Sequence, residues 1–499
     1  MILSCVSFLV YPQKSMVKSL VPQVSSNVPD YFCTWNLQGY VVSYCGSDST
    51  RKALTEEYLF GDKKYQGWTN CYPTIRKDMF FVMDDSWDIP KDVNSVPNEY
   101  LGMAELSHDR FPSFKGEAIE RLKKLTDSIK SLGWKGVGGW ICAQKPQMCA
   151  QISERDYWKQ RIAAMNLAGF DYWKVDWGYN DRNGIWRKML TEIGKHHAPH
   201  LWVEHAMVNE FIEFSDVFRT YDVENIIAQP VTIQRVCGLL PYKPNKGAKG
   251  LINCEDEPYI AAGLGCVIGV MRHPFAGALP NGLQDFVFPP VGRDIKHRLD
   301  EVVRGIRWHR IAEPFGVGVE KNFFVDSVKL KDMWILGEKE TWQTGRAIGS
   351  VITAEAPARV SRGLPLPWVS DSVSADRPFI LASCYPNGAV AIVSVGRSIG
   401  RNYSTKEISV RVQLETLDRP IGIFGYFSEV CLVFSSAVKW NRHRIFAQDL
   451  ASDNPIDITC MIKAENNKIK IPGDVIRRIG LMNASKGDCS DPGLVLQIK

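Results

Sequence analysis

The sequence predicts a (β/α)8 barrel followed by a C-terminal antiparallel β-sandwich. Between residues 31 and 275, eight short apolar runs alternate with helical stretches, which is the rhythm and size of a (β/α)8 barrel. After residue 314, short runs alternate apolar and polar residues and are separated by turn sequences, as in an antiparallel sandwich. The chain of 499 residues is also too long for one compact core.

The barrel prediction depends on eight strands and the helices between them. The predicted strands are residues 32–37, 79–87, 136–142, 172–178, 201–206, 216–222, 250–256 and 266–273. Amphipathic helices are predicted at 114–133 and 154–169, each ending at a glycine, and at 294–314, ending at a proline. A doubly wound open sheet is the alternative, but no Gly-rich phosphate loop follows the first strand.

These elements divide the chain into three parts: an N-terminal extension (1–30), the barrel (31–314) and the C-terminal domain (315–499). The sandwich is indicated by the runs at 379–385, 389–396, 407–414, 421–427 and 429–435. Residues 1–15 include a short apolar stretch with no preceding basic residue and no A-x-A site, so they make a poor signal peptide. The cellular compartment therefore stays open between cytoplasmic and periplasmic or secreted.

Composition excludes several classes of partner. The formal net charge is only +5, with 60 basic and 55 acidic residues intermixed, so we expect neither nucleic acid nor an acidic membrane surface as a partner. No apolar run is long enough to predict a membrane span. The 13 cysteines form no CxxC pair, which argues against a zinc site. Whether the chain forms a homo-oligomer is not determined by the sequence.

Acidic residues gather where the predicted strands end, and in a barrel that edge carries the chemistry. A single carboxylate at such a place often caps the following helix. Acids at five strand ends of one barrel are harder to explain as caps. They are Asp84 and Asp85, Asp176, Glu204, Asp222, and Glu255 with Asp256.

The fourth predicted strand, "YWKVDWG" at 172–178, carries two opposite charges. Side chains alternate along a strand, so Lys174 and Asp176 share the inner face while Trp173, Val175 and Trp177 face the helices. We expect Lys174 to keep Asp176 ionised and ready to act as a nucleophile. A purely structural ion pair is the alternative.

Glycoside hydrolysis needs a second carboxylate beside the nucleophile. In that reaction one carboxylate attacks the anomeric carbon and another protonates the leaving oxygen. Asp222, in "FRTYDVEN", is the candidate for the second role.

Four blocks of the sequence, taken together, resemble the α-galactosidase-type glycoside hydrolases, the clan that also holds α-N-acetylgalactosaminidases, β-L-arabinopyranosidases and raffinose synthases. The blocks are "YFCTWN", "MDDSWD", "RFPSFKGEAIERLKKLTDSIKSLGWKGVGGWI" and "AGFDYWKVDW", in the family's order within residues 31–275. "MDDSWD" resembles the family's "DDGW", and "YWKVD" resembles a block whose final aspartate is the nucleophile.

The resemblance implies a retaining exo-acting glycosidase that needs no cofactor and no metal and takes a carbohydrate substrate. Asp176 would be the nucleophile and Asp222 the acid/base. The implied sugar-binding residues are Asp84, Asp85, Lys174, Arg219, Trp35, Trp87, Trp140, Glu204, His205 and Asp256. Arg219 precedes Asp222 by three positions, whereas the family's arginine precedes its acid by four. "VEHAMVNE" and "NCEDEPYIAAG" also depart from the family pattern, so the sugar need not be plain galactose.

Other functions stay open at this level. Arg219, Arg235, Arg272 and His273 would suit an anionic sugar, although arginines more often pair with neighbouring acids. The covalent intermediate could be intercepted by another sugar, which would make the protein a transglycosidase, and a non-catalytic carbohydrate-binding homologue is a further alternative. A metal-dependent hydrolase is disfavoured because no H-x-H stands on the first predicted strand.

Overall fold

The computed structural model describes residues 18–61, 66–93, 99–220, 226–275, 278–282, 293–337, 340 and 346–499. The predictions made for residues 1–15 and for Asp222 lie outside this part of the chain.

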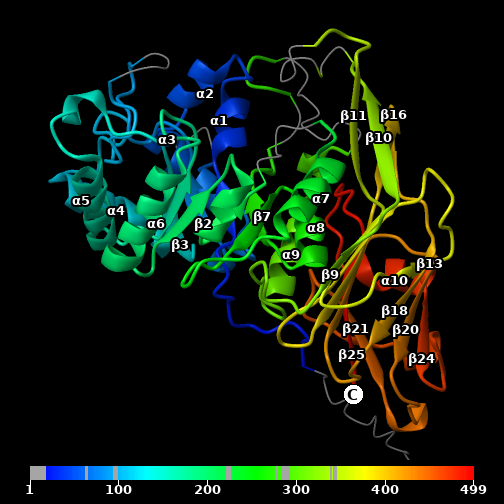
Figure 1. The fold of residues 1–499 in the computed structure, drawn as a ribbon. Helices are drawn as coiled ribbons and strands as arrows, with labels where there is room; N and C mark the ends of the chain where they lie inside the picture. The colour runs from blue at the N-terminus through cyan, green and yellow to red at the C-terminus, as the bar shows by residue number, and fades with distance from the viewer. Residues whose placement is uncertain are drawn as a thin grey trace, which may run out of the picture.

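Eight parallel strands close into a barrel in chain order, β1 to β8 (Figure 1). This confirms the predicted (β/α)8 architecture, and a doubly wound sheet is excluded because an open sheet has two edges. The observed strands are shorter than the apolar runs that predicted them. They are β1 (Tyr31–Cys33), β2 (Phe80–Met83), β3 (Gly136–Ile141), β4 (Tyr172–Val175), β5 (Trp202–His205), β6 (Val217–Arg219), β7 (Leu251–Glu255) and β8 (Val267–Val270).

Helices surround the barrel and follow most of its strands. The predicted helices at 114–133, 154–169 and 294–314 are present as α4, α5 and α9, each shorter than its prediction. The helices are α1 (Trp35–Val41), α2 (Ser47–Lys52), α3 (Glu56–Phe60), α4 (Ala118–Ser131), α5 (Glu154–Leu167), α6 (Gly184–His197), α7 (Ala228–Leu239), α8 (Pro258–Leu264) and α9 (Leu299–His309). No helix among the described residues is long and apolar enough to cross a membrane.

Large side chains fill the barrel interior, and a layer of hydrogen-bonded polar groups lies between them and the ends of the strands. Tyr31 and Tyr172 meet edge to face with ring centroids 5.2 Å apart. The Tyr172 hydroxyl donates to Glu204 at 2.7 Å, and the Asn253 amide donates to the same carboxylate oxygen at 2.7 Å. Gly269 makes room for this layer, because a Cβ there would lie 2.7 Å from the Tyr31 ring. The interior is therefore packed up to the level at which the strands end.

The described residues of the C-terminal part form three sheets with the strand orders β11-β10-β16-β17, β22-β21-β25-β19-β15-β14-β12-β9 and β13-β18-β20-β24-β23. The strands are β9 (Phe323–Val325), β10 (Lys329–Ile335), β11 (Val351–Pro357), β12 (Arg359–Arg362), β13 (Trp368–Val369), β14 (Phe379–Cys384), β15 (Val390–Val395), β16 (Arg397–Gly400), β17 (Asn402–Ser404), β18 (Ser409–Leu414), β19 (Ile421–Phe424), β20 (Glu429–Phe434), β21 (Ile445–Asp449), β22 (Ile456–Asp457), β23 (Lys463–Glu465), β24 (Lys468–Pro472) and β25 (Gly493–Ile498), with α10 (Gly473–Gly480) before β25.

The predicted C-terminal sandwich is confirmed, and its eight-stranded and five-stranded sheets combine antiparallel pairs with parallel ones. β12 pairs with β14, β15 with β19, and β18 with β20 in parallel. Parallel neighbours need a crossover connection, so their pairing is decided by contacts distant in sequence and leaves no local turn signal. The eight-stranded and five-stranded sheets still enclose a shared apolar core, as a sandwich requires.

The middle strands of the eight-stranded sheet, β14, β15 and β19, are buried on both faces because the second face packs on the barrel. Ile380 and Ile392 point into the sandwich core, whereas Leu381 and Val393 belong to the apolar cluster of the barrel. Gly263 on α8 permits this approach, because a Cβ there would lie 2.7 Å from Val393. Figure 1 shows α7, α8 and α9 on the side of the barrel that faces the C-terminal strands.

Candidate active site

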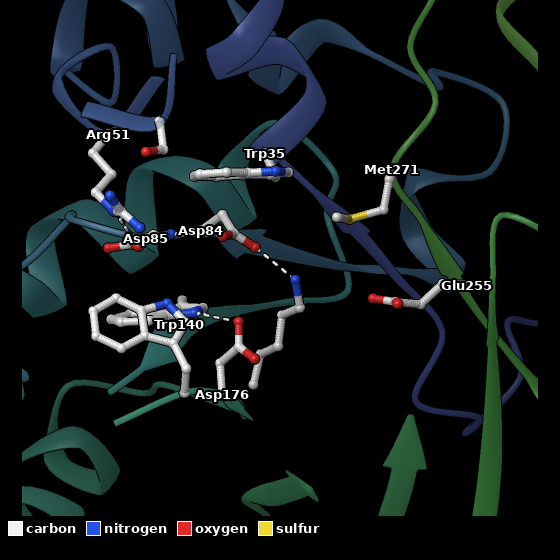
Figure 2. A pocket seen from close by; sticks show the side chains of 11 residues that line it. Trp35, Arg51, Asp84, Asp85, Trp140, Asp176, Glu255 and Met271 are labelled. Atoms are coloured by element: carbon white, nitrogen blue, oxygen red, sulfur yellow. Dashed lines mark hydrogen bonds and ion pairs between the residues drawn. The ribbon is translucent and has the colours of Figure 1, made fainter. Parts of the chain in front are cut away.

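A cavity of about 260 Å³ opens where the barrel strands end (Figure 2). Its walls combine aromatic rings, carboxylates and two cations, so it offers both stacking surfaces and hydrogen-bonding groups. The lining residues are Trp35, Ser47, Arg51, Asp84, Asp85, Trp140, Lys174, Asp176, Trp177, Glu255 and Met271.

Asp176 directly follows β4, and each of its carboxylate oxygens accepts a hydrogen bond. Arg219 on β6 donates to Oδ1 at 3.0 Å, and the Trp140 indole on β3 donates to Oδ2 at 2.9 Å. The main chain at this point is fixed by the buried Arg187, which donates to the carbonyl oxygens of Val175 at 3.2 Å and of Asp176 at 2.6 Å. One charged and one polar donor therefore fix the orientation of this carboxylate, and it faces the cavity.

Lys174 lines the cavity beside Asp176, as strand alternation predicted, but its ion-pair partner is Asp84. The Nζ atom lies 2.7 Å from Asp84 Oδ2, with both side chains almost fully buried. Burial alone would raise the pKa of Asp84, but the Lys174 ammonium and hydrogen bonds, including one from the Cys33 thiol, lower it below its ordinary value. The expectation that Lys174 is the cation paired with Asp176 is corrected, because the direct cationic partner of Asp176 is Arg219.

Asp85 lies next to this pair and is bound by Arg51, an arginine outside the sequence motifs. Arg51 on α2 donates to Asp85 Oδ2 at 2.8 Å, and Ser86 donates to Oδ1 at 2.9 Å. Burial raises the pKa of Asp85 to about 6, although Arg51 opposes the shift. Asp85 is therefore a carboxylate that can exchange a proton near neutral pH.

The five tryptophans in and around the cavity have different surroundings. Trp35 and Trp140 line it, as does Trp177, whose ring centroid is 5.3 Å from that of Trp140. The strand-alternation prediction that Trp177 faces the helices does not hold, because β4 ends at Val175 and the chain turns. Trp173 does face the helices and packs on Trp158. Trp87 lies behind the cavity, where its indole donates to the Trp140 carbonyl at 2.8 Å.

Five predicted sugar-binding residues are not part of the cavity wall: Trp87, Arg219, Glu204, His205 and Asp256. Glu204 lies beneath the floor, bound by Tyr172 and Asn253, and burial raises its pKa. His205 points away from the barrel axis, with Nε2 2.8 Å from the Thr191 hydroxyl and Nδ1 3.3 Å from Arg187; burial lowers its pKa, so it is neutral. Asp256 turns outward and accepts from the backbone amide of Met271 at 2.8 Å.

Strand parity accounts for one of the wall residues that the sequence analysis did not select. Asn253 points into the barrel, so a period of two also directs Glu255 inward and Asp256 outward. Glu255 accepts from the Tyr31 hydroxyl at 3.4 Å and lies 3.7 Å from Arg219. Ser47, Arg51 and Met271 lie on a helix or loop, where no alternation could have predicted them.

The structure also bears on two alternatives. No group of three or more His, Cys, Asp or Glu side chains within the described ranges could hold a metal ion. Arg219 and Arg272 are engaged with neighbouring acids. The lining carboxylates Asp84, Asp85, Asp176 and Glu255 outnumber the lining cations Arg51 and Lys174, which does not favour an anionic sugar.

The sequence matches no protein-family model and no curated protein sequence. Several solved structures are similar in fold. α-Galactosidase I from Mortierella vinacea is 12% identical, with 94% of this chain and 96% of that chain covered at a TM-score of 0.39. The α-galactosidase from Saccharomyces cerevisiae is 8% identical, with 95% and 96% covered at a TM-score of 0.36. An Anoxybacillus α-amylase is 7% identical, with 84% and 86% covered at a TM-score of 0.34. Two of these are α-galactosidases, the class that the sequence motifs resemble, but scores this low leave the function to be argued from the cavity.

Proposed function

We propose that the protein is a retaining exo-glycosidase that removes a terminal α-galactoside, or a galactose-like sugar, from oligo- or polysaccharides. The observation that carries this proposal is Asp176. Its carboxylate faces the cavity, and its two oxygens accept hydrogen bonds from Arg219 at 3.0 Å and Trp140 at 2.9 Å. A carboxylate held rigidly in this way is suited to attack on an anomeric carbon.

The size and walls of the cavity support action on a single terminal sugar. Its volume of about 260 Å³ lies below the range of about 300–1,000 Å³ found for sites that hold drug-sized ligands. Trp35, which lines the cavity and is only partly buried, offers an apolar face on which a sugar ring can stack, whereas Trp140 is fully buried. A cavity with room for one ring favours cleavage at the non-reducing end.

The proposed reaction has two steps. In the first, Asp176 attacks the anomeric carbon, the glycosidic bond breaks, and an acid protonates the leaving oxygen, which leaves a glycosyl-aspartate ester. In the second step, the residue that acted as the acid now acts as a base and deprotonates a water molecule. This water attacks the anomeric carbon, breaks the ester to Asp176 and releases the sugar with its original configuration. We assign the acid/base role to Asp222 on the sequence resemblance, and this assignment is a prediction.

The Asp84–Lys174 pair is proposed to bind ring hydroxyl groups. The ammonium can donate to a hydroxyl oxygen, and the adjacent carboxylate can accept the proton of a neighbouring hydroxyl. Because the two side chains also hold each other at 2.7 Å, they present a fixed pattern to the sugar. Asp85 and Arg51 offer a second pattern of the same kind beside them.

A panel of nitrophenyl glycosides tests the proposal: α-galactoside, α-N-acetylgalactosaminide, β-L-arabinopyranoside and α-glucoside. Wild-type protein should release nitrophenol from at least one of the first three. Asp176→Ala should reduce kcat at least about 10³-fold, and azide should restore turnover with a glycosyl azide of inverted configuration. Full activity of Asp176→Ala would exclude the mechanism.

The same assay separates the alternatives that the sequence leaves open. Product analysis by NMR in the presence of excess galactose or raffinose shows whether water or a sugar hydroxyl takes the glycosyl group. Transfer products in excess over free sugar would favour a transglycosidase. Sugar binding without release of nitrophenol from any of the glycosides would favour a non-catalytic carbohydrate-binding protein.

A further inference from the structure

The wall formed by Glu255 and Met271 depends on a strained residue between the two strands that carry it. Asp256, directly after β7, has φ of 51°, in the left-handed region. Such a conformation costs a non-glycine residue about 1–3 kcal/mol and persists only where its surroundings hold it. The turn at Asp256 lets Glu255 point into the cavity while the chain continues into α8.

Asp256 is held by the chain that follows β8. Its Oδ1 atom accepts from the backbone amides of Met271 at 2.8 Å and Arg272 at 3.0 Å. The Arg272 guanidinium in turn donates to the Asp256 carbonyl, and its Nε lies 3.5 Å from Oδ1. Asp256 and Arg272 therefore join the ends of β7 and β8 and set Glu255 and Met271 side by side.

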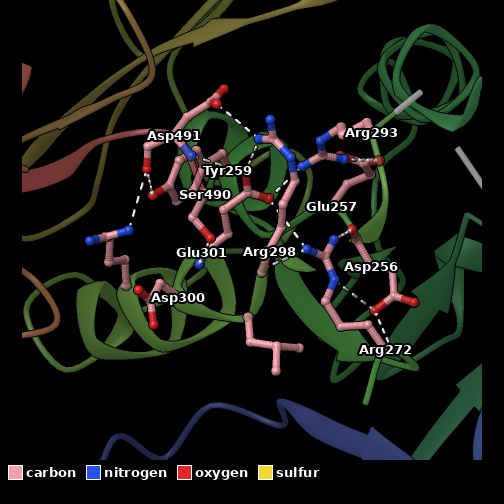
Figure 3. A network of polar contacts seen from close by, with 12 residues as sticks. Asp256, Glu257, Tyr259, Arg272, Arg293, Arg298, Asp300, Glu301, Ser490 and Asp491 are labelled. Atoms are coloured by element: carbon pink, nitrogen blue, oxygen red, sulfur yellow. Dashed lines mark hydrogen bonds and ion pairs between the residues drawn. The ribbon is translucent and has the colours of Figure 1, made fainter. Parts of the chain in front are cut away.

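Arg272 is in turn fixed by α9. Its Nη1 atom lies 3.3 Å from Glu301 Oε2 and donates to the Arg298 carbonyl at 2.9 Å. Glu301 is fully buried and also pairs with Arg293 and Arg298, so three guanidinium groups converge on one carboxylate (Figure 3). The position of Arg272 follows from that of Glu301.

The C-terminal domain completes the chain of contacts. Arg298 Nη1 lies 2.8 Å from Asp491 Oδ1, just before β25, and the Ser490 hydroxyl accepts from the Glu301 amide at 3.0 Å. Figure 3 shows these side chains in one continuous network between α9 and the C-terminal strands. The network is buried, and in a low dielectric each charge fixes the orientation of the next.

We propose that the C-terminal domain positions the Glu255–Met271 wall of the cavity, with Asp491 and Glu301 as positioning residues that act through Arg298, Arg272 and Asp256. Buried ion pairs contribute little net stability compared with apolar packing, so a role in orientation explains this network better than a role in stability. The mechanical part of the proposal stands on these contacts alone. Its kinetic consequence rests on the proposed glycosidase function.

Hydrogen exchange of the intact protein tests the mechanical part. Glu301→Gln and Asp491→Asn should accelerate exchange of the Met271 and Arg272 amides at least about tenfold, because the Asp256 carboxylate no longer holds them. Asp449→Asn is the matched control. It breaks a buried pair with Arg304 across the same interface (Nε–Oδ1 3.0 Å). Arg304 also donates to the Asp491 carbonyl at 3.4 Å, but the change removes none of the side-chain contacts among Arg298, Glu301 and Asp491.

Unchanged protection in Glu301→Gln and Asp491→Asn would overturn the proposal. Equal acceleration in all three variants would also overturn it, because that result means a general loosening of the interface. If Glu301→Gln does not fold, Asp491→Asn decides the result, and Ser490→Ala, a neutral change that removes the acceptor for the Glu301 amide, serves as a milder third variant.

The kinetic arm uses the nitrophenyl glycoside that wild-type protein cleaves fastest among the α-galactoside, the α-N-acetylgalactosaminide and the β-L-arabinopyranoside. A displaced wall weakens binding of ground state and transition state alike, so KM should rise about 3- to 10-fold in Glu301→Gln and Asp491→Asn while kcat stays within about twofold. Asp449→Asn should leave both constants unchanged. If wild-type protein cleaves none of these three glycosides, the proposed function fails while the exchange experiment still decides the positioning role.

Discussion

Lys174 donates its hydrogen bond to Asp84, 2.7 Å away on the neighbouring part of the cavity wall, and not to Asp176 two residues along its own chain. Asp176 is held by Arg219 at 3.0 Å and by Trp140 at 2.9 Å. The carboxylates of Asp84 and Asp176 therefore have different hydrogen-bond donors, although both line the same cavity. Asp84 is paired with the Lys174 ammonium, and Asp176 faces the cavity with one hydrogen-bond donor on each oxygen.

Removal of the Lys174 ammonium should destabilise the protein as well as inactivate it. Lys174→Met leaves the buried Asp84 without its cation, which should raise the Asp84 pKa and cost about 3–5 kcal/mol of unfolding free energy. The double variant Lys174→Met/Asp84→Asn should regain most of the stability but not the activity. Urea unfolding and kcat/KM on the active glycoside measure the two effects. Recovered activity in the double variant would contradict a substrate-binding role for the pair.

The hydrogen bond from Trp140 to Asp176 can be tested with little change of shape. Trp140→Phe keeps an aromatic ring but removes the indole donor 2.9 Å from Oδ2, so kcat/KM should fall about 10- to 150-fold, as expected for loss of a hydrogen bond to a charged group (about 1.5–3 kcal/mol). Trp177→Phe is the matched control, because Trp177 lines the same cavity beside Trp140. A similar loss in both variants would assign the effect to packing instead of the hydrogen bond.

Arg51 should set the acid limb of the pH profile. Asp85 has a pKa of about 6, raised by burial and opposed by Arg51, so kcat/KM should fall below about pH 6 if ionised Asp85 binds substrate. Arg51→Met removes the opposing charge and should move this limb to higher pH by about one unit. Asp48→Asn, which alters the exposed carboxylate 3.5 Å from Arg51, should leave the limb in place. An unchanged limb in Arg51→Met would exclude Asp85 as the titrating group.

The barrel was predictable because its strands are buried on both faces. All residues of β2, β3, β4 and β7 are buried, so these strands appear in the sequence as short continuous apolar runs. The parallel pairs of the C-terminal sheets could not be predicted in the same way. β18 and β20 show a correct strand signal, but their parallel register depends on a long connection and on contacts with β24.

The candidate site was predictable where its residues lie on strands or in the quoted motifs. Lys174 and Asp176 share a face by simple alternation, and the same rule applied to β7 would have selected Glu255 in place of Asp256. Arg51 could not be found in this way. It lies on α2, a helix inserted between β1 and β2, and reaches the cavity only through the packing of that insertion.

Asp88 should make the stability of the protein fall as pH rises. Its Oδ2 accepts from the Ala104 amide at 2.8 Å, while its buried Oδ1 has no partner among the described residues. Burial raises its pKa to about 7 against this hydrogen bond. Between about pH 4 and 7 the unfolded chain loses this proton and the folded protein keeps it, so the unfolding free energy should fall by up to about 4 kcal/mol.

Asp88→Asn should remove this dependence on pH. The unfolding free energy of the variant, measured with urea, should match that of wild type near pH 4 and exceed it at pH 8. Asp127→Asn changes an exposed ion pair on α4 and is the control: its unfolding free energy should change with pH in the same way as that of wild type. If the unfolding free energy of Asp88→Asn also changes with pH as that of wild type does, Asp88 is ionised in the folded state.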